Sequence, residues 1–519
     1  SRGLGDVYKR QGIQNFESLR LDGYFYIDKT ALIYQLVKSG RYYFLSRPRR
    51  FGKSLLISTL EAYFQGKKEL FQGLAMEKLE KDWTKYPILH IDLNTQKYDS
   101  PQSLESKLNR TLVTWEKLYG SEPAEDSLSM RFEGTIQRAY EQTGQRVVIL
   151  VDEYDKPMLQ AIGNKELQNS FRETLKAFYG ALKSKDGCIK FAMLTGVTKF
   201  GKVSVFSDLN NLDDISMWNE YIELCGISEK EIHKNLETEL HEFADVQKMT
   251  YDSFCEKLRQ YYDGYHFTHN SIGMYNPFSL LNAFKRKEFG SYWFETGTPT
   301  YLVELLKRHH YNLERMAHEE TNAQVLNSID SESTSPIPVI YQSGYLTIKG
   351  YDEEFGIYHL GFPNKEVEEG FIQFLVPYYT SMNNVESPFE IQKFVREIRS
   401  GDYNSFFQRL QSFFADTTYE IIREQELHYE NVLFIIFKLV GFYVKVEYHT
   451  SRGRIDLVLQ TDKFIYIMEF KLNGTAEEAL QQINDKHYAL PFETDGRRLF
   501  KIGVNFSAET RNIEKWIVE

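Results

Sequence analysis

The chain has 519 residues, of which 42% are hydrophobic and 26% charged, so it is globular in composition and too long for a single core. Its formal net charge is −11, which excludes a global positive field; any nucleic-acid binding must use local patches. The three cysteines, Cys188, Cys225 and Cys255, are widely spaced. They argue against a disulfide framework or a structural zinc site and favour a cytoplasmic protein. No apolar run reaches membrane-spanning length.

The first segment with predicted secondary structure begins after residue 11. Residues 1–11, SRGLGDVYKRQ, show no periodicity, and we interpret them as a non-native leader outside the fold. Residues 24–27 predict a short strand. Asp28 is then a candidate N-cap for a helix that ends at Gly40.

A phosphate-binding loop follows. Residues 42–45 predict a strand and residues 54–64 a helix, and the loop between them reads SRPRRFGKS. The P-loop pattern GxxxxGK[ST] is met at Gly52, Lys53 and Ser54. The amides of the helix N-terminus and Lys53 can hold the β- and γ-phosphates of a nucleotide, and Ser54 can ligate Mg²⁺.

The same loop is rich in arginine. Arg47 stands where the general pattern has its first glycine, so the match to the P-loop is partial. Arg49 and Arg50 add positive charge that can contact phosphate or nucleic acid. An arginine finger cannot be chosen among Arg47, Arg49, Arg50 and Arg172.

The run VVILVDEYDKP, residues 147–157, predicts a strand buried on both faces of a parallel sheet. Asp152 and Glu153 stand at its C-terminal edge, where open α/β sheets bind their ligands. This is the pattern of a Walker B element, in which Asp152 holds Mg²⁺ and Glu153 polarises water. A buried strand with an acidic end is also common without that role.

Further strands alternate with helices. Strands are predicted at 87–94 and 189–196, and helices at 103–119, 129–143 and 166–183. This alternation predicts a parallel α/β sheet with helices on both faces. Thr195 lies at the polar exit of the last strand, where it could sense a γ-phosphate; threonine at a strand end is also ordinary.

Four stretches together, SRPRRFGKSL, YFYIDKT, LVDEYDKP and LTGVTKF, resemble the AAA-ATPase-like family of P-loop proteins. The family's own loop has arginine at the position of Arg47. The resemblance implies ATP binding at Lys53, Ser54 and Asp152, with Glu153 as the candidate base for hydrolysis. It also implies a PD-(D/E)XK nuclease-like domain later in the chain.

Three domains are expected after the leader. An AAA-like P-loop domain is predicted at 12–225, and a helical lid and connector at 226–387. Within the second, residues 338–363 alternate as two strands around a DEEFG turn, which suggests a winged-helix-like module with little positive charge. Residues 388–519 form the third predicted domain, an α/β fold with helices at 389–414 and 424–439 and a strand at 442–447.

The second chemical signal lies in GRIDLVLQTDKFIYIMEFKLNG. Glu469 and Lys471 are two apart on one predicted strand and therefore share a face of the sheet. If Asp462 and Lys463 form a two-residue turn, Asp456 stands directly opposite Glu469. A three-residue loop would put the two acids on opposite faces. Two carboxylates can ligate Mg²⁺ and the lysine can orient or activate the attacking water.

This D…ExK arrangement resembles the PD-(D/E)XK nuclease superfamily, although Ile455 replaces the proline of the superfamily name. In the family pattern a glutamate on the preceding helix completes the metal shell; Glu426 matches best, and Glu430 is the fallback. The following AEEALQQIN helix carries the family's ALxQI element, in which Gln482 would approach the site. The alternative is a surface hairpin with alternating charges.

The leading hypothesis is an ATP-binding AAA-like protein coupled to a Mg²⁺-dependent nuclease that acts on nucleic acid phosphodiesters, with DNA expected ahead of RNA as the partner. The alternative is a nucleotide-switched sensor or scaffold whose nuclease-like domain binds a partner without cleaving. A third interpretation, in which both sites are degenerate, is disfavoured because the key residues of both are intact. No membrane partner is expected, and the oligomeric state is open.

Overall fold

The computed structural model describes residues 15–94, 96–297, 300–327, 329, 335–383, 385–415 and 422–519. The predicted leader, residues 1–11, lies outside them. The chain forms two compact units. The first unit contains the chain up to Leu302 together with Ala317–Val367, and the second contains Val303–Met316 and Glu368–Glu519. None of the described helices combines the length and the apolar character needed to cross a bilayer.

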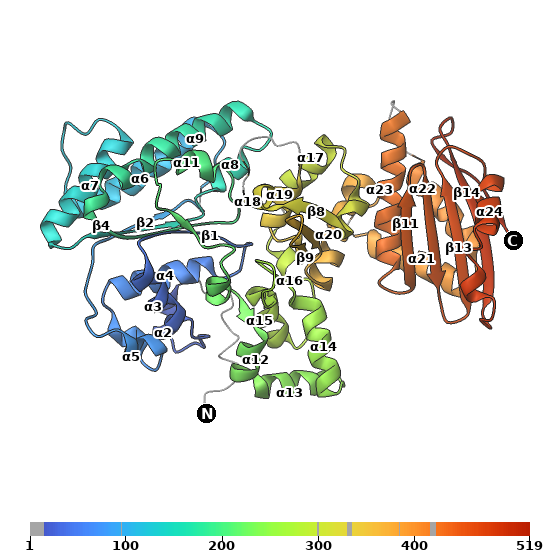
Figure 1. Cartoon of the computed structure of the whole chain (residues 1–519), viewed down its shortest axis with the longest axis horizontal. Coiled ribbons are helices and arrows are strands. Elements are labelled where there is room, and N and C mark those ends of the chain that lie inside the picture. The colour runs from blue at the N-terminus through green and yellow to red at the C-terminus, as the bar shows by residue number, and fades with distance from the viewer. Residues whose placement is uncertain are drawn as a thin grey trace. The chain divides into compact units, whose positions relative to one another are not determined.

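A five-stranded sheet organises the first unit (Figure 1). Every strand pairs in parallel, in the order β2-β3-β4-β1-β5. The strands are β1 (Tyr42–Ser46), β2 (Ile88–Asp92), β3 (Val147–Asp152), β4 (Ile189–Gly196) and β5 (Asp213–Asp214). The order places β4 between β1, which leads into the phosphate loop, and β3, which carries the acids. The predicted parallel sheet is thus confirmed.

Helices cover both faces of this sheet, so its central strands are largely apolar. All six residues of β3 are buried. Figure 1 shows α3 and α4 on one side of the sheet and α6, α7 and α9 on the other. The helices are α2 (Phe16–Leu21), α3 (Thr30–Ser39), α4 (Lys53–Phe64), α5 (Ala75–Leu79), α6 (Pro101–Tyr119), α7 (Leu128–Thr143), α8 (Lys156–Gln160), α9 (Lys165–Tyr179), α10 (Ala181–Ser184) and α11 (Lys202–Val205).

The rest of the first unit is helical with two small antiparallel sheets. The predicted hairpin is present as β9 and β10, and β8 pairs with β10 on its other side. The elements are α12 (Glu229–Asn235), α13 (Glu237–Val246), α14 (Tyr251–Tyr262), α15 (Pro277–Arg286), α16 (Tyr292–Glu295), α18 (Ala323–Asn327), α19 (Ile337–Gln342), β6 (Ile227–Ser228), β7 (Met274–Tyr275), β8 (Glu319–Asn322), β9 (Thr347–Asp352) and β10 (Ile357–Gly361). Two of the three unit boundaries lie within the helices α17 (Tyr301–Arg308) and α20 (Lys365–Tyr379), and the third lies in the 3-10 helix Leu313–Ala317.

The second unit is built on a mixed sheet in sequential order, β11-β12-β13-β14-β15 (Figure 1). Only the β13–β14 pair is parallel. Its strands are β11 (Lys445–Ser451), β12 (Arg454–Gln460), β13 (Phe464–Lys471), β14 (Arg498–Ser507) and β15 (Asn512–Val518), and its further helices are α21 (Ser387–Ser400), α22 (Tyr403–Phe414), α23 (Ile422–Val440) and α24 (Ala476–Asp485).

The two faces of the second sheet carry different helices. On one face Phe470 packs against Phe407 of α22 and Phe437 of α23. On the other face Ile467 clusters with Ile483 of α24. Residues 467 and 470 point to opposite faces because side chains alternate along a strand. The sheet is therefore sandwiched between two helical layers, and the face of Glu469 is the one that α24 covers.

Three predictions of secondary structure need correction. Residues 24–27 form neither a strand nor a helix; Phe25 and Ile27 pack against the α12–α15 core. The strand predicted at 442–447 begins only at Lys445. The residues before it form turns that follow the end of α23, in which, for example, Tyr443 N donates a hydrogen bond to Val440 O. The helix predicted at 166–183 is divided into α9 and α10 at Gly180.

Gly503 sets how closely α24 approaches the sheet. A Cβ at this position would lie 2.5 Å from Leu480 N and closer still to Ala476 O, both in α24. We expect Gly503→Ala to destabilise the second unit by about 1–3 kcal/mol, the usual cost of overpacking. Hydrogen exchange of the β13 and β14 amides should accelerate roughly tenfold to a hundredfold.

Gly496→Ala is the matched control, since a Cβ there would meet no atom within 4 Å. Unchanged exchange in Gly503→Ala would contradict the close packing of α24 on β14.

Candidate active sites

The phosphate loop ends at a backbone turn that only glycine adopts freely. Gly52 has a φ of 94° and is the N-cap of α4. The next residue, Lys53, is 3% exposed, and its Nζ donates hydrogen bonds to the carbonyls of Arg47, at 2.9 Å, and Pro48, at 3.0 Å. The same Nζ lies 3.5 Å from Glu153 Oε1. The lysine is thus held between the loop and the acidic strand end.

Three predicted nucleotide-site residues meet at the edge of the sheet. Ser54 Oγ donates a 2.6 Å hydrogen bond to Asp152 Oδ2. Thr195 Oγ1 donates to Asp152 Oδ1 at 3.0 Å. The carboxylate of Asp152 therefore bridges the ends of α4 and β4. Serine, threonine and aspartate oxygens are the hard ligands that Mg²⁺ prefers.

Glu153 follows β3 in a strained conformation. Its φ of 57° is in the left-handed region, which non-glycine residues rarely occupy. Burial raises the pKa of Glu153 to about 7, against the opposing charge of Lys53. A carboxylate that titrates near neutral pH has the basicity required of a general base.

Asp155 of the same run has a structural role. It is fully buried, and its carboxylate accepts 2.7 Å hydrogen bonds from both Thr198 N and Thr198 Oγ1. Burial raises its pKa. These bonds tie the turn after β3 to the exit of β4, which fixes the direction of Glu153.

A cavity of about 730 Å³ opens over the loop and is large enough for a nucleotide. Gly52, Lys53, Ser54 and Glu153 contribute to its lining. Arg49 and Arg50 line it as well, as their predicted role requires. The Arg49 guanidinium stacks 4.2 Å from the Trp293 ring and donates to Trp293 O at 3.1 Å. Asp152 and Thr195 lie deeper and do not line it among the described residues.

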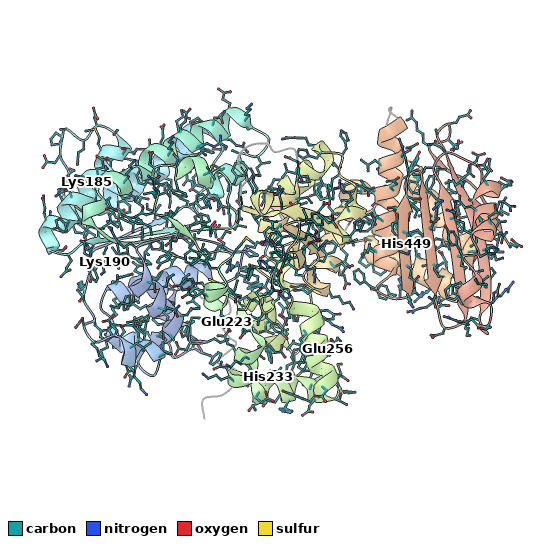
Figure 2. All side chains as sticks on the ribbon, in the orientation of Figure 1. Lys185, Lys190, Glu223, His233, Glu256 and His449 are labelled. Atoms are coloured by element: carbon teal, nitrogen blue, oxygen red, sulfur yellow. The ribbon has the colours of Figure 1, made fainter. Side chains whose placement is uncertain are left out.

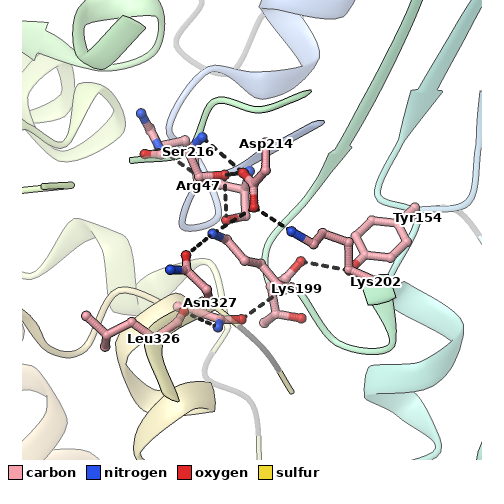
Figure 3. Close-up of polar contacts among 11 residues, drawn as sticks. Arg47, Tyr154, Lys199, Lys202, Asp214, Ser216, Leu326 and Asn327 are labelled. Atoms are coloured by element: carbon pink, nitrogen blue, oxygen red, sulfur yellow. Dashed lines mark hydrogen bonds and ion pairs between the residues drawn. The ribbon is translucent and has the colours of Figure 1, made fainter. Parts of the chain in front are cut away.

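Arg47 is located differently from its neighbours. It is 2% exposed, packs 4.0 Å from the Phe267 ring and donates to Ser216 O at 2.7 Å (Figure 3). Figure 3 also shows Lys199 and Lys202, which both form ion pairs with Asp214 at 2.9 and 2.7 Å. Within the part of the chain that the structure describes, Arg47 does not line the 730 Å³ cavity. It supports the loop and does not reach a ligand there.

The second site lies on β12 and β13. Asp456 pairs directly with Glu469, and a hydrogen bond from Thr461 N to Phe464 O closes the turn at Asp462 and Lys463. The predicted two-residue turn and its register are confirmed. The next strand extends the row: His449 of β11, labelled in Figure 2, pairs with Asp456. The Asp456 side chain is 20% exposed and that of Glu469 is 0% exposed.

Two basic residues flank the acid pair on the same face. Lys471 and Arg454 pair with each other one step along the ladder, each two residues from an acid. Arg454 Nε lies 3.2 Å from Asp456 Oδ1 and 3.9 Å from Glu469 Oε1. Neither contact has the geometry of a hydrogen bond.

The acid pair has the properties of a cation site. Both carboxylate oxygens of Glu469 and one of Asp456 are buried without a hydrogen-bond partner. Burial, together with the charge of Asp456, raises the pKa of Glu469 to about 7. Mg²⁺ is commonly bound by one or two carboxylates, with water and substrate phosphate completing its shell. The residues therefore fit a magnesium ion.

The predicted third acid does not join this pair. Glu426 accepts a hydrogen bond from Asn473, in the loop after β13. Glu430, the fallback, accepts from Asn312 Nδ2 at 2.9 Å, and burial raises its pKa to about 7. Among the described residues, no three His, Cys, Asp or Glu side chains are grouped to hold a metal. Gln482 is half-buried on α24, and its role at the acids stays a prediction.

Sequence reasoning overlooked three residues at this site. Arg454 belongs to the GRID stretch, but the spacing of its guanidinium from both acids depends on its rotamer. Lys486 and Tyr488 follow α24. The charge of Lys486 lowers the pKa of Glu469. Burial raises the pKa of Tyr488, and the charge of Asp456 raises it further. In the sequence these two residues belong to the KHY stretch after the QQI helix, and no periodic pattern there marks them as site residues.

Divalent-cation binding at the acid pair should strengthen as pH rises. A cation must displace the proton that Glu469 holds below its pKa of about 7. We expect the affinity for Mn²⁺, measured by isothermal titration calorimetry, to be about tenfold lower at pH 6 than at pH 8. Above about pH 8 the affinity should no longer change with pH. Glu469→Gln should remove both the binding and its pH dependence. Equal affinity of the wild-type protein at the two pH values would contradict the assignment.

Comparison with known proteins agrees with both halves of this description. The family model described as predicted AAA-ATPase matches residues 10–206, and the model of the PD-(D/E)XK nuclease superfamily matches residues 424–516. The chain is 35% identical over 524 residues to the "Uncharacterized protein in vnfD 5'region" of Azotobacter chroococcum mcd 1, covering 98% of each sequence. No solved structure matches. The chain belongs to the AAA-ATPase-like family and carries a PD-(D/E)XK nuclease superfamily domain.

Proposed function

We propose that the protein is an ATP-binding AAA-like ATPase coupled to a Mg²⁺-dependent nuclease that cleaves nucleic-acid phosphodiesters, with DNA the preferred substrate. The observation that carries the proposal is the pairing of Asp456 with Glu469. This pairing leaves buried carboxylate oxygens without partners on the face that also carries Lys471. A structural hairpin gains nothing from such oxygens, whereas a cation site requires them.

The nucleotide site would work through its own side chains. Lys53 would leave the carbonyls of Arg47 and Pro48 to contact the β- and γ-phosphates of ATP. Ser54 and Asp152 would hold Mg²⁺, which neutralises phosphate charge when bound. Glu153 would accept a proton from the attacking water, a role that its raised pKa supports. Thr195 holds the other oxygen of Asp152 and would keep that carboxylate oriented.

At the nuclease site, Asp456 and Glu469 would hold Mg²⁺, with Glu426 or Glu430 approaching only if α23 moves. When bound, such an ion would supply Lewis-acid chemistry, polarising a phosphodiester and acidifying water. Lys471 would contact the scissile phosphate or orient the water, since it shares the face of both acids. The domain limits of 12–225, 226–387 and 388–519 remain part of this proposal.

A second candidate function is a nucleotide-switched sensor whose nuclease-like domain binds a partner without cleaving. The observation in its favour is Arg454, whose guanidinium supplies a positive charge beside the acid pair. The ungrouped position of Glu426 favours it as well.

Cleavage of plasmid DNA separates the two functions. We expect the purified protein with Mg²⁺ to nick or cut supercoiled plasmid, and Lys471→Ala to lower the rate at least about a hundredfold, the scale on which positioned catalytic groups act. Lys463→Ala is the matched control, because that lysine is exposed in the turn of the same hairpin. If the wild-type protein cuts no form of DNA or RNA, with or without ATP, the nuclease proposal fails.

ATP binding and hydrolysis should separate in two variants of the first unit. Lys53→Ala should abolish ATP binding in an equilibrium filter assay, because the site loses the ammonium group that would contact the phosphates. Glu153→Gln should still bind ATP but hydrolyse it about 100-fold to 10,000-fold more slowly, the usual worth of a general base.

Lys85→Ala, at an exposed lysine, should leave both properties unchanged. Normal ATP binding by Lys53→Ala would overturn the assignment of the phosphate loop.

A further inference from the structure

Arg454 is the one cation within ion-pair distance of both acids among the described residues. Its Nε is 3.2 Å from Asp456 Oδ1 and 3.9 Å from Glu469 Oε1. Arg454 is the first residue of β12 and lies beside the acid pair. It is 21% exposed, so solvent reaches part of the guanidinium.

The contact between Arg454 and the acids is loose. Arginine binds a carboxylate most strongly through two parallel hydrogen bonds, and neither is present here. Glu469 keeps both oxygens unpartnered, and its pKa remains raised although Arg454 lowers it. The arginine therefore compensates the acids only in part and is not locked in its place.

The same side chain is positioned to reach substrate. Arg454 pairs with Lys471 across the β12–β13 ladder, and both point to the face of the acids. A phosphate beside Lys471 would lie next to the guanidinium as well. Guanidinium groups match phosphate oxygens in a planar, two-point arrangement.

We propose that Arg454 is a positioning residue that moves from the acids to the substrate phosphate. Without a divalent cation it offsets part of the negative charge of Asp456 and Glu469. A divalent cation and the guanidinium would repel each other at these distances, so cation binding expels Arg454 toward the phosphate of nucleic acid. The site then binds its cation before its nucleic acid. This inference rests on the proposed nuclease function.

The test compares two affinities in the full-length protein. Arg454→Gln removes the internal competitor, so Mn²⁺ should bind about fivefold to tenfold more tightly in calorimetry without nucleic acid. With Ca²⁺ as the divalent cation, the same variant should bind a DNA duplex about tenfold more weakly than the wild-type protein. Arg454→Lys should restore most of both properties. Arg452→Gln, at an exposed arginine in the adjoining turn, should change neither metal affinity nor its stoichiometry.

The two possible failures are distinct. Equal or weaker Mn²⁺ binding by Arg454→Gln, with wild-type binding intact, overturns the role of Arg454 alone. So does unchanged DNA affinity of that variant in Ca²⁺. If neither the wild-type protein nor Arg454→Gln binds Mn²⁺, the proposed nuclease function is overturned and the inference falls with it. A similar thermal midpoint of wild type and variant shows that the affinities compare folded proteins.

Discussion

Each unit of this protein buries a glutamate that it does not fully neutralise. Glu153 lies after β3 and Glu469 within β13, and burial raises the pKa of both to about 7. A buried carboxylate without full compensation costs free energy, and folding alone gives nothing in return. A bound cation or a cation–phosphate complex would recover that cost, because ligands that bind only the native state stabilise it. The two sites, on two different sheets, therefore have the same feature: a buried glutamate that a bound cation would stabilise.

The sequence was sufficient to predict those parts of the structure that depend only on neighbouring residues. Asp462 and Lys463 are the two residues enclosed by the hydrogen bond from Thr461 N to Phe464 O, and from this even turn the position of Asp456 opposite Glu469 follows by counting. The strand–loop–helix around Gly52 and the buried strand before Asp152 were equally local. Glycine, a two-residue turn and an apolar run constrain the backbone without help from distant segments.

The sequence failed where distant packing decides. Residues 24–27 have the composition of a strand, yet Phe25 and Ile27 are held by the helices α12–α15 and find no strand to pair with. Arg47 resembles Arg49 and Arg50 in the sequence, but Phe267 and Ser216, more than a hundred residues away, draw it into the interior. Glu426 was assigned from a family pattern, and the position of Asn473 determines where its carboxylate lies. None of these partners is visible in a local window.

The charge balance at the nuclease site also bears on how an acidic protein could bind nucleic acid. The whole chain carries −11, so long-range attraction to phosphate is absent. On the site face, the charges of Arg454 and Lys471 and those of Asp456 and Glu469 sum to zero when both acids are ionised. A divalent cation would leave this group of four with a net charge of about +2, and at short range that charge is screened little by salt. Affinity for nucleic acid would then be increased by the cation, because the four side chains alone contribute no net positive charge.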